Sequence, residues 1–468
     1  MLVLALLLAF LVRLIALNQS LWLDEATTAR VLQQFNFLQI VSQFAPYDFH
    51  PPLYYLFLKL WTSFFGYSEI ALRMPSVLFS LGAGWFVYLI GAKLKNEKAG
   101  LWAVVFFLFN PLIVYYSQEA RMYMMVTFLL TGALYFLIKL LDTQFMTRKG
   151  ALPSIYKVPS LQKLILSLYL FNLFVFLAFL TFYGSVFLIA TIYLYLLVQK
   201  QFRLLLLLLP GFILAILLVS PLLIQQYINS RNQLTLVANW TNVLGTVNLK
   251  NFLLIPLKFS IGRISWEPKA VYYAVGGLWT MFVILAAAKN LIKSDPSLAF
   301  GGFRITLGVL FIVPLILGAI FSIFSPLLQY FRFLYLVPLM SLLIATGADR
   351  KWQKIALLIG FSAFSSVYLL NPNFHREDWK SLTGSLSKRQ KVYMIPSSAD
   401  PLRYYNPEVT VVDIRKENIK DKKIVVIPHT TDIYGFNYKN KLQDKGFSQQ
   451  KIQSFRGLTF EVWSKKEF

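Results

Sequence analysis

The 468-residue sequence contains no cysteine and unusually few charged residues. Without cysteine there are no disulfide bonds and no thiolate metal sites, so zinc-finger modules are excluded and thiols do not indicate the redox compartment. Charged residues make up 14% of the chain and hydrophobic residues 57%, whereas an average soluble protein has about 25% and about 45–50%. This composition favours a membrane protein.

Long apolar runs account for most of the hydrophobic residues. A helix needs about 20 apolar residues to cross a hydrocarbon core about 30 Å thick. The first run lacks a basic amino-terminal region and a small-residue cleavage site, so we expect it to be retained rather than removed as a signal peptide. We predict an α-helical polytopic membrane protein with about eleven transmembrane helices, near residues 1–17, 71–92, 99–117, 119–141, 161–181, 183–199, 204–226, 270–288, 305–323, 327–347 and 352–370.

The formal net charge of +24 is distributed in a way that argues against nucleic acid as a partner. Sixteen lysines and arginines fall in five alternate loops, at residues 93–98, 139–163, 200–203, 289–304 and 350–354. Only seven fall in the opposite loops, at residues 18–70 and 227–269. Cytoplasmic loops are enriched in these residues. We therefore predict a multi-pass protein of the cytoplasmic (inner) cell membrane, surrounded by its lipids, with a cytoplasmic amino terminus and an external carboxyl terminus.

The residues after 370 read as a separate soluble domain. Strand-like alternation of apolar and polar residues occurs at 391–396, 409–414, 423–428 and 458–464, and helical patterns lie near 376–388 and 437–446. We predict a membrane module over residues 1–370 and a small external α/β domain over residues 371–468. Within the module, residues 18–70 form the first external loop with interface helices, and residues 227–269 form an external insertion.

Acidic residues are scarce in the membrane module. Residues 1–370 hold ten of them, and six fall in predicted external segments. Asp24 and Glu25 stand side by side directly after the first span, among apolar residues. Taking a carboxylate out of water is costly unless the group is paired or does chemistry. The structural alternative is that Asp24 caps a helix running to about residue 42, which would also fix the orientation of its neighbour.

A predicted tight external turn carries Glu119 and Arg121 among several tyrosines, including Tyr116 and Tyr123. Tyrosine hydroxyls beside an arginine suit a phosphate and a sugar, which makes this turn a candidate site. The structural alternatives are a local ion pair between Glu119 and Arg121, and tyrosines that anchor the chain at the membrane interface.

Two other segments have a structural and a functional interpretation. His50 precedes a double proline, which sets a rigid turn into an amphipathic helix over residues 53–65 lying in the interface plane. A purely structural turn is the simpler interpretation there. Arg332 lies just inside the tenth span on the external side, where it either snorkels to the headgroups or supplies a permanent cation at the depth of a lipid phosphate.

Together these segments resemble the GT-C glycosyltransferases, in particular the family 39 group that includes protein O-mannosyltransferases and the lipid A aminoarabinose transferase. The resemblance is strongest over residues 18–141, and the later helices match in layout more than in motif. It rests on short motifs, which are Asp24-Glu25, His50–Tyr55, Arg73–Ser76, Ser117–Tyr123 and Phe331–Phe333.

The resemblance implies a membrane glycosyltransferase. It would move a sugar from a polyprenyl-phosphate donor to an acceptor hydroxyl on a lipid, protein or polysaccharide at the external face, with inversion at the anomeric carbon. By the family pattern Asp24 is the general base, Glu25 shapes the site and Glu119 orients acceptor or ligands. The implied donor-phosphate ligands are Arg121, Arg332, His50 and Arg73, and the implied substrate-lining residues are Tyr54, Tyr55, Tyr116 and Tyr123.

The chain departs from some relatives beside His50, where they carry an acid and this sequence has Phe49. Asp48 is one residue further away. A divalent metal, the one cofactor that the family suggests, would have Asp48 and Glu119 as candidate ligands. The external carboxylates can also work without a metal, because the carrier phosphate is already a good leaving group.

Three alternatives remain open at this point. An oligosaccharide ligase of related architecture would use a polyprenyl-diphosphate donor. A transporter would place ionisable residues or broken helices near the membrane midplane in two repeats, and the sequence has neither pattern. A non-catalytic relative would use the external domain for binding, and it would be indifferent to Asp24→Asn.

Overall fold

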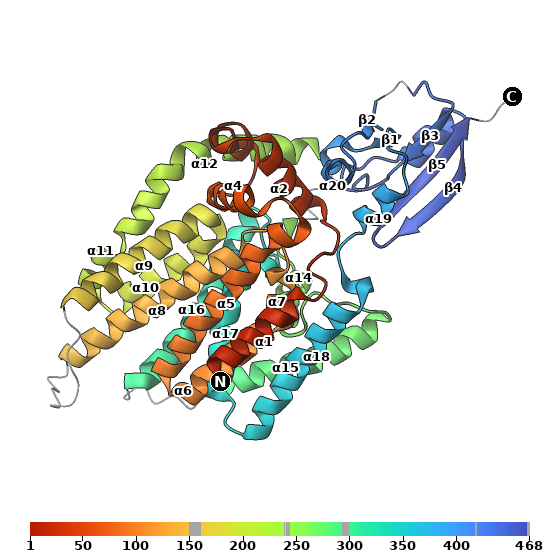
Figure 1. Ribbon diagram of the computed structural model, residues 1–468. Helices are drawn as coiled ribbons and strands as arrows, with labels where there is room; N and C mark the ends of the chain where they lie inside the picture. The colour runs from red at the N-terminus through yellow and green to blue at the C-terminus, as the bar shows by residue number, and fades with distance from the viewer. Residues whose placement is uncertain (149–160, 238, 240–243, 293–298, 417–418, 466–468) are drawn as a thin grey trace.

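The computed structural model describes the chain except for residues 149–160, 238, 240–243, 293–298, 417–418 and 466–468. Helices dominate as far as Leu370, and a small sheet follows (Figure 1). Within the described residues, eight helices are long and apolar enough to cross a membrane, or nine if one bent pair counts as a single span. The predicted polytopic helical fold with a small carboxyl-terminal α/β unit is confirmed.

Each of the eleven predicted spans falls on helix, although the first and sixth are too short to count as full spans by length. The bundle consists of α1 (Leu2–Leu14), α5 (Glu69–Leu94), α6 (Glu97–Leu108), α7 (Pro111–Ser117), α8 (Tyr123–Arg148), α9 (Leu161–Thr181), α10 (Val186–Val198), α11 (Phe202–Leu208), α12 (Pro210–Leu236), α15 (Lys269–Ile292), α16 (Ala299–Phe324), α17 (Val337–Gly347) and α18 (Lys351–Leu370).

The third predicted span is broken, with a bend of 61° between α6 and α7. Helix α6 ends at Leu108, and Asn110 starts α7 as its N-cap, because its side chain accepts hydrogen bonds from the backbone N–H groups of Leu112 and Ile113 at 2.9 and 3.2 Å. Pro111 occupies the first position of α7, where its missing N–H costs nothing. The bend directs the end of α7 and the turn after it into the candidate site.

Between α1 and α5 the chain forms short helices at one end of the bundle. They are α2 (Leu23–Gln34), α3 (Phe37–Gln39), the π-helix η1 (Ile40–Phe44), the 3₁₀ helix η2 (Ala45–Tyr47) and α4 (Leu53–Phe65). The predicted continuous helix to residue 42 is wrong, because Asn36 starts a new helix with a capping box. The amphipathic helix over residues 53–65 is confirmed, with Tyr54, Tyr55 and Leu58 on its buried face.

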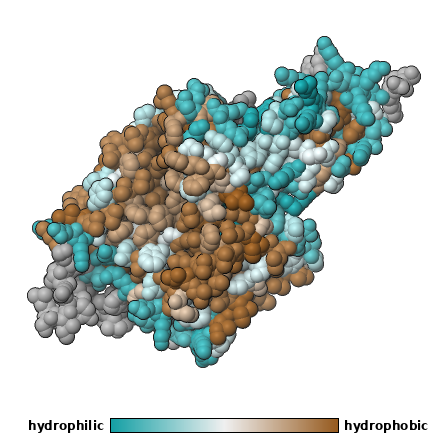
Figure 2. All heavy atoms as spheres, viewed as in Figure 1, coloured by the Kyte–Doolittle hydropathy of each residue, from teal (hydrophilic) through white to brown (hydrophobic). Residues whose placement is uncertain are grey.

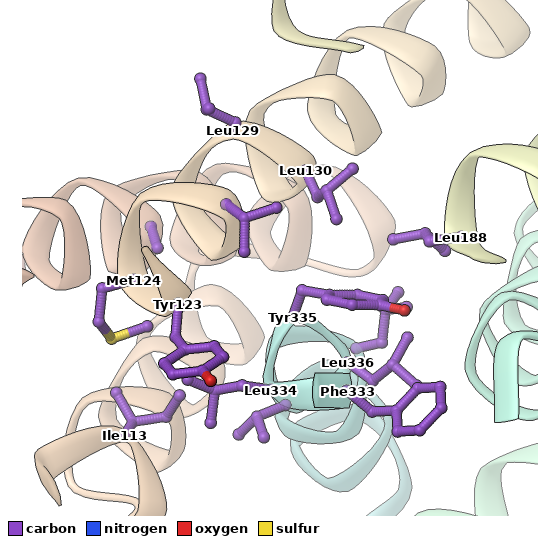
Figure 3. Packing of buried hydrophobic residues seen from close by; sticks show 14 of the residues in the cluster. Ile113, Tyr123, Met124, Leu129, Leu130, Leu188, Phe333, Leu334, Tyr335 and Leu336 are labelled. Atoms are coloured by element: carbon purple, nitrogen blue, oxygen red, sulfur yellow. The ribbon is translucent and has the colours of Figure 1, made fainter. Parts of the chain in front are cut away.

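The remaining elements of the helical part are η3 (Tyr183–Ser185), α14 (Leu249–Ile261) and η4 (Tyr330–Leu336). The 3₁₀ helix η4 packs against α8 in the bundle core. Figure 3 shows Tyr123 at the start of α8 beside Leu334 of η4 and Ile113 of α7, all of them buried. This contact brings the aromatic-arginine-aromatic motif of η4 to the turn that precedes α8.

The carboxyl-terminal region contains η5 (Pro372–Phe374), α19 (Trp379–Gly384), β1 (Lys391–Met394), η6 (Pro396–Ser398), α20 (Asp400–Tyr405), β2 (Thr410–Asp413), β3 (Lys423–Val426), α21 (Tyr438–Asp444), β4 (Phe447–Phe455) and β5 (Leu458–Lys465). The strand order is β2-β1-β3-β5-β4, with β1 parallel to β2 and β3 and the last two pairings antiparallel. The four predicted strands and two predicted helices all occur. The sequence analysis missed β4 and α20.

The sheet lies at one end of the molecule, and the amino terminus lies at the other (Figure 1). Helix α20 packs against α2, so the sheet region adjoins the short helices between α1 and α5. Hydrophobic side chains cover much of the visible face of the bundle, whereas hydrophilic side chains dominate the sheet region (Figure 2). This distribution suits a bundle in lipid and a sheet region in water.

Candidate active site

A buried ion pair fixes the start of α2. Arg73 of α5 and Glu25 of α2 approach within 2.5 Å, and both side chains are fully buried. Arg73 donates two bonds to Glu25 and three more to the backbone carbonyls of Leu17, Gln19 and Ser20. All five N–H groups of its guanidinium are therefore occupied. The predicted phosphate contact of Arg73 does not fit this geometry, because no donor is left to meet a ligand.

Glu25 also holds the turn between α7 and α8. Its Oε1 accepts a hydrogen bond from the backbone N–H of Ala120 at 2.7 Å. Ser76 donates to the carbonyl of Glu119 at 2.6 Å from the opposite side. Burial opposes ionisation of Glu25, but Arg73 outweighs it, so the pKa of Glu25 lies below its ordinary value. Glu25 is thus an ionised carboxylate that positions backbone, in agreement with a shaping role.

Glu119 does not form the local pair with Arg121 that is the simplest interpretation of the sequence. It pairs with Arg376, which lies 257 residues later in the segment before α19. The two side chains are only 2% and 6% exposed. Burial raises the pKa of Glu119 above its ordinary value, since Arg376 offsets only part of the desolvation and the nearby Glu25 adds repulsion. Arg376 was not predicted as a site residue, because the sequence around it contains no pattern that indicates a distant partner.

Arg121 faces Asp24 instead. Its Nη2 lies 3.7 Å from Asp24 Oδ2, and its Nη1 donates to the hydroxyl of Tyr55 at 3.3 Å. The Asp24 side chain is 42% exposed, whereas Arg121 is buried. Asp24 lies in the first turn of α2, and Trp22 is the N-cap, so the predicted capping role of Asp24 is wrong. Its carboxylate is free for another task, in a position that the helix dipole favours.

Asp48 and His50 form a second small cluster beside Arg121. His50 Nδ1 lies 3.3 Å from Asp48 Oδ1, and the imidazole stacks on Phe182 at 6.1 Å between ring centroids. Burial raises the pKa of Asp48, but His50 and Arg121 outweigh it and leave this pKa below its ordinary value. The carbonyl of His50 also accepts from the Gln226 side chain at 3.1 Å, so the turn is tied to α12. His50 therefore fixes the turn through its backbone carbonyl and pairs with Asp48 through its side chain.

The predicted substrate-lining tyrosines are all buried, and Tyr55 and Tyr123 lie within electrostatic range of Arg121. The ring centroids of Tyr54 and Tyr55 are 6.1 Å apart and those of Tyr116 and Tyr123 are 5.2 Å apart, both as edge-to-face pairs. Tyr123 is within electrostatic range of Arg121, Glu119, Asp24 and Arg332. Tyr123 therefore lies near charged residues of α2, of the turn before α8 and of η4.

Arg332 is held mainly by backbone. Its Nη1 donates to the carbonyls of Leu244 and Pro326 at 3.1 and 3.3 Å, and its guanidinium lies over the ring of Phe331 at 5.8 Å. It thereby connects η4 to the segment before α14. Its side chain is half-buried, so the guanidinium is not fully in water. Some of its N–H groups are occupied by the backbone carbonyls rather than turned toward the site.

A further cation, Arg263, stands near the same tyrosines. It follows α14 and donates to the hydroxyl of Tyr115 at 2.7 Å while remaining exposed. It is also within electrostatic range of Tyr330, Tyr116 and Glu119. Arg263 is one of the seven basic residues of the predicted external loops, and it was not predicted as a site residue. Its proximity to the tyrosine-rich turn comes from the packing of α14 on α7, which the sequence does not reveal.

The structure thus brings Asp24, Glu25, Asp48, Glu119, Arg121 and Tyr123 into one region with Arg332 at its edge. The two candidate metal ligands have protein partners there, Asp48 with His50 and Glu119 with Arg376. Within the described part of the chain, no three histidine, aspartate or glutamate side chains are grouped so that they could hold a metal ion. The residues present therefore do not fit a three-ligand metal site.

Part of the sequence matches a known protein family. Residues 49–153 match the family model described as dolichyl-phosphate-mannose-protein mannosyltransferase, a stretch that includes His50, Arg73, Glu119 and Arg121. None of the curated proteins matches the sequence.

Among solved structures, the chain is similar to ArnT from Cupriavidus metallidurans bound to undecaprenyl phosphate, with a TM-score of 0.59 and 12% identity over 98% of this chain and 97% of that one. It is also similar to the archaeal oligosaccharyltransferase AglB from Archaeoglobus fulgidus, solved in complex with an inhibitory peptide and a dolichol-phosphate. That TM-score is 0.55, with 11% identity over 98% of this chain and 74% of that one. The chain therefore has the fold of the GT-C glycosyltransferases, and its residues 49–153 carry the sequence pattern of the dolichyl-phosphate-mannose-protein mannosyltransferase family.

Proposed function

We propose that this chain is an inverting glycosyltransferase that moves a sugar from a polyprenyl-phosphate donor to an acceptor hydroxyl, with Asp24 as the general base. The observation that carries the proposal is the exposure of Asp24. Its side chain is 42% exposed. Glu25 and Glu119 are buried and paired with Arg73 and Arg376, and Asp48, whose side chain is 14% exposed, is paired with His50. Of these four acids, Asp24 alone combines access for an acceptor with a cation that orients it.

The reaction is a single displacement at the anomeric carbon. Asp24 accepts the proton of the acceptor hydroxyl, whose oxygen forms the new bond to the anomeric carbon. The bond from that carbon to the phosphate oxygen breaks, and the polyprenyl phosphate leaves with the electron pair. Attack from the face opposite the leaving group inverts the configuration. Glu25 and Glu119 contribute by fixing the backbone of α2 and of the turn that presents Arg121.

The leaving phosphate needs cations that face a ligand. Arg263 is exposed and donates through Nη1 to a tyrosine hydroxyl, and Arg121 lies within reach of Asp24. Positive charge in a cleft poor in water stabilises the charge that develops on a leaving phosphate. Arg332 and His50 serve the same purpose at the edges, while Tyr54, Tyr55, Tyr116 and Tyr123 line the sugar. ArnT, whose fold is similar, was solved with undecaprenyl phosphate, which makes a lipid of this class the natural candidate carrier.

We place the site at the external face of the cytoplasmic membrane, with the amino terminus inside. The support is the excess of lysine and arginine in the loops assigned to the cytoplasm, together with the position of the sheet region at the end of the bundle opposite the amino terminus. In this arrangement residues 371–468 form an external domain beside the site.

Mass analysis of surface glycans and glycolipids, in cells with and without the gene, tests the proposal and names the sugar and the acceptor together. Deletion should remove one sugar from one class of acceptor. The wild-type gene should restore the sugar, and the Asp24→Asn gene should not, although its product still inserts in the membrane. Glu267→Gln is the matched control, since Glu267 is an external carboxylate that is 70% exposed and pairs with Lys269. Full restoration by Asp24→Asn would refute the proposal.

The second candidate is an oligosaccharide ligase that uses a diphosphate carrier, and the similarity to AglB favours it. The carrier decides between the two. Purified protein in lipid should accept the identified sugar on a polyprenyl monophosphate and ignore the same sugar on the diphosphate. The opposite preference would replace the first proposal with the second.

A further inference from the structure

We infer that Arg376 is a positioning residue through which the carboxyl-terminal region completes the candidate active site. Arg376 lies outside the helical bundle in sequence, but its side chain enters the site and holds Glu119. The inference rests on the proposed glycosyltransferase function and adds a part of the chain that the family match over residues 49–153 does not cover.

The guanidinium of Arg376 contacts two aromatic rings. It lies 4.4 Å from the ring centroid of Trp22 and 4.4 Å from that of Tyr115. Trp22 is the N-cap of α2, two residues before Asp24, and Tyr115 belongs to α7, which leads to Glu119. One side chain therefore bridges the two elements that carry the acids of the site. Two cation–π contacts and an ion pair with a carboxylate restrict the orientation of this side chain.

The backbone of Arg376 is anchored as firmly as its side chain. Its N–H donates to the Gln19 side chain at 3.3 Å, in the segment between α1 and α2. Its carbonyl accepts from Nε of Arg456 at 2.7 Å, and the carbonyl of Arg456 accepts from the N–H of Asp378 at 2.9 Å. Arg456 lies in the turn between β4 and β5. The position of Arg376 is thus set by the sheet region on one side and by the membrane helices on the other.

The same region is docked around α2 by several other hydrogen bonds. The hydroxyl of Tyr405 accepts from the N–H of Leu21 at 2.8 Å, and Thr27 of α2 donates to Asp400 at 2.9 Å. These bonds lie on either side of Asp24 and Glu25 in the sequence. Docking of the sheet region and placement of Arg376 are therefore coupled, and movement of the region would withdraw the cation from Glu119.

The electrostatics explain why the site needs this cation. Glu25 and Glu119 are two buried carboxylates within range of one another, and each has its own buried arginine, Arg73 or Arg376. Without Arg376, Glu119 would be an unpaired buried acid and would take up a proton. The turn that carries Glu119 also carries Arg121, which orients Asp24. Loss of Arg376 would therefore disturb the base without touching it.

The test uses membrane vesicles from cells that carry each variant, since these hold their own donor and acceptor, and transfer is followed by mass analysis of the glycan. Arg376→Gln should slow transfer at least tenfold. It should also move the acidic limb of the pH profile upward by about one unit or more, because an arginine beside a carboxylate lowers its pKa by about one to three units. Binding of undecaprenyl phosphate by the purified protein in nanodiscs should change less than twofold. Arg376→Lys should recover part of the rate, since lysine keeps the charge but not the planar stack.

Matched variants separate this role from general damage. Arg389→Gln removes an arginine of the same region that is 89% exposed and pairs with Glu408, and it should leave transfer unchanged. Glu119→Gln combined with Arg376→Gln should be no slower than Glu119→Gln alone, because Arg376 acts through Glu119. Losses that multiply, or an Arg376→Gln rate equal to wild type, would overturn the inference.

If Arg376→Gln does not accumulate in cells, the double variant Glu119→Gln, Arg376→Met takes its place, because it leaves no unpaired buried charge. That double variant should match Glu119→Gln in rate, and a faster rate would overturn the inference. Hydrogen exchange of residues 117–122 tests the positioning role without any transfer assay, since Arg376→Gln should reduce the protection of this turn. An active Asp24→Asn would refute the proposed function, whereas unchanged protection of the turn would refute the role of Arg376.

Discussion

Replacement of Arg73 by methionine should cause a large loss of stability, because it leaves Glu25 unpaired in the core. Both side chains are 0% exposed. Removing one partner of a buried ion pair costs about 3–5 kcal/mol. The carbonyls of Leu17, Gln19 and Ser20 also lose their donor, at about 1 kcal/mol or more each. The expected loss is about 6 kcal/mol or more.

The apparent unfolding temperature of the purified protein in lipid nanodiscs, followed by intrinsic fluorescence, should fall by on the order of 10 °C. Adding Glu25→Gln to the Arg73 variant should restore part of this loss, since it removes the buried charge and keeps an acceptor for the N–H of Ala120. Lys93→Met is the matched control, because Lys93 lies on the same helix and its pair with Asp142 is 32% exposed on each side. It should cost no more than about 1 kcal/mol.

The reasoning fails if Arg73→Met and Lys93→Met unfold at the same temperature. It also fails if the double variant at Arg73 and Glu25 is less stable than Arg73→Met alone. Either result would mean that the charge of Glu25 is not held in the buried, ionised state that the geometry requires.

Three other predictions concern single contacts. Since the pKa of Glu25 is depressed in the folded protein, its contribution to stability is complete above the ordinary glutamate pKa of about 4.3 and is lost as the pH falls through the lower folded pKa. Below about pH 4.3, the unfolding temperature of Glu25→Gln should therefore decline less steeply with falling pH than that of the wild type. Parallel curves for the two proteins would contradict this. Arg263→Gln should weaken binding of undecaprenyl phosphate in nanodiscs about tenfold, whereas Lys269→Gln, which removes a neighbouring exposed cation, should leave binding unchanged. Equal affinities for the two variants would remove Arg263 from the phosphate site. Tyr404→Phe removes the hydrogen bond to the carbonyl of Tyr67 and should weaken docking of the sheet region by about 1 kcal/mol. Hydrogen exchange in α20 should become faster, and unchanged exchange would contradict this prediction.

Much of the fold could be predicted from the sequence because hydropathy and helix length are local properties. The amphipathic helix that became α4 was predicted residue for residue, since the double proline at residues 51–52 and the apolar spacing mark it. The bend at Asn110 was not predicted. Asparagine before proline is a local signal for a helix start, but a continuous apolar run over residues 99–117 conceals it. The strand β4 was missed because most of its side chains are polar and exposed.

The candidate site shows where sequence reasoning stops. The motifs around Asp24, His50 and Glu119 could be found, and the structure brings them together. Their partners could not be assigned from spacing. Glu119 and Arg121 are two positions apart, yet Glu119 pairs with Arg376, 257 residues away. Arg73 was predicted to meet a phosphate, whereas the carbonyls before α2 occupy its donors. Such pairings depend on tertiary packing, which one sequence does not encode in any local pattern.

The central claim is that Asp24 accepts the proton of the acceptor. Its most direct test is the rate of sugar transfer by Asp24→Asn in membrane vesicles that hold their own donor and acceptor, compared with wild type at the same protein level. The account predicts a rate lower by about 10²–10⁴-fold, with binding of undecaprenyl phosphate unchanged. A rate within twofold of wild type would contradict it.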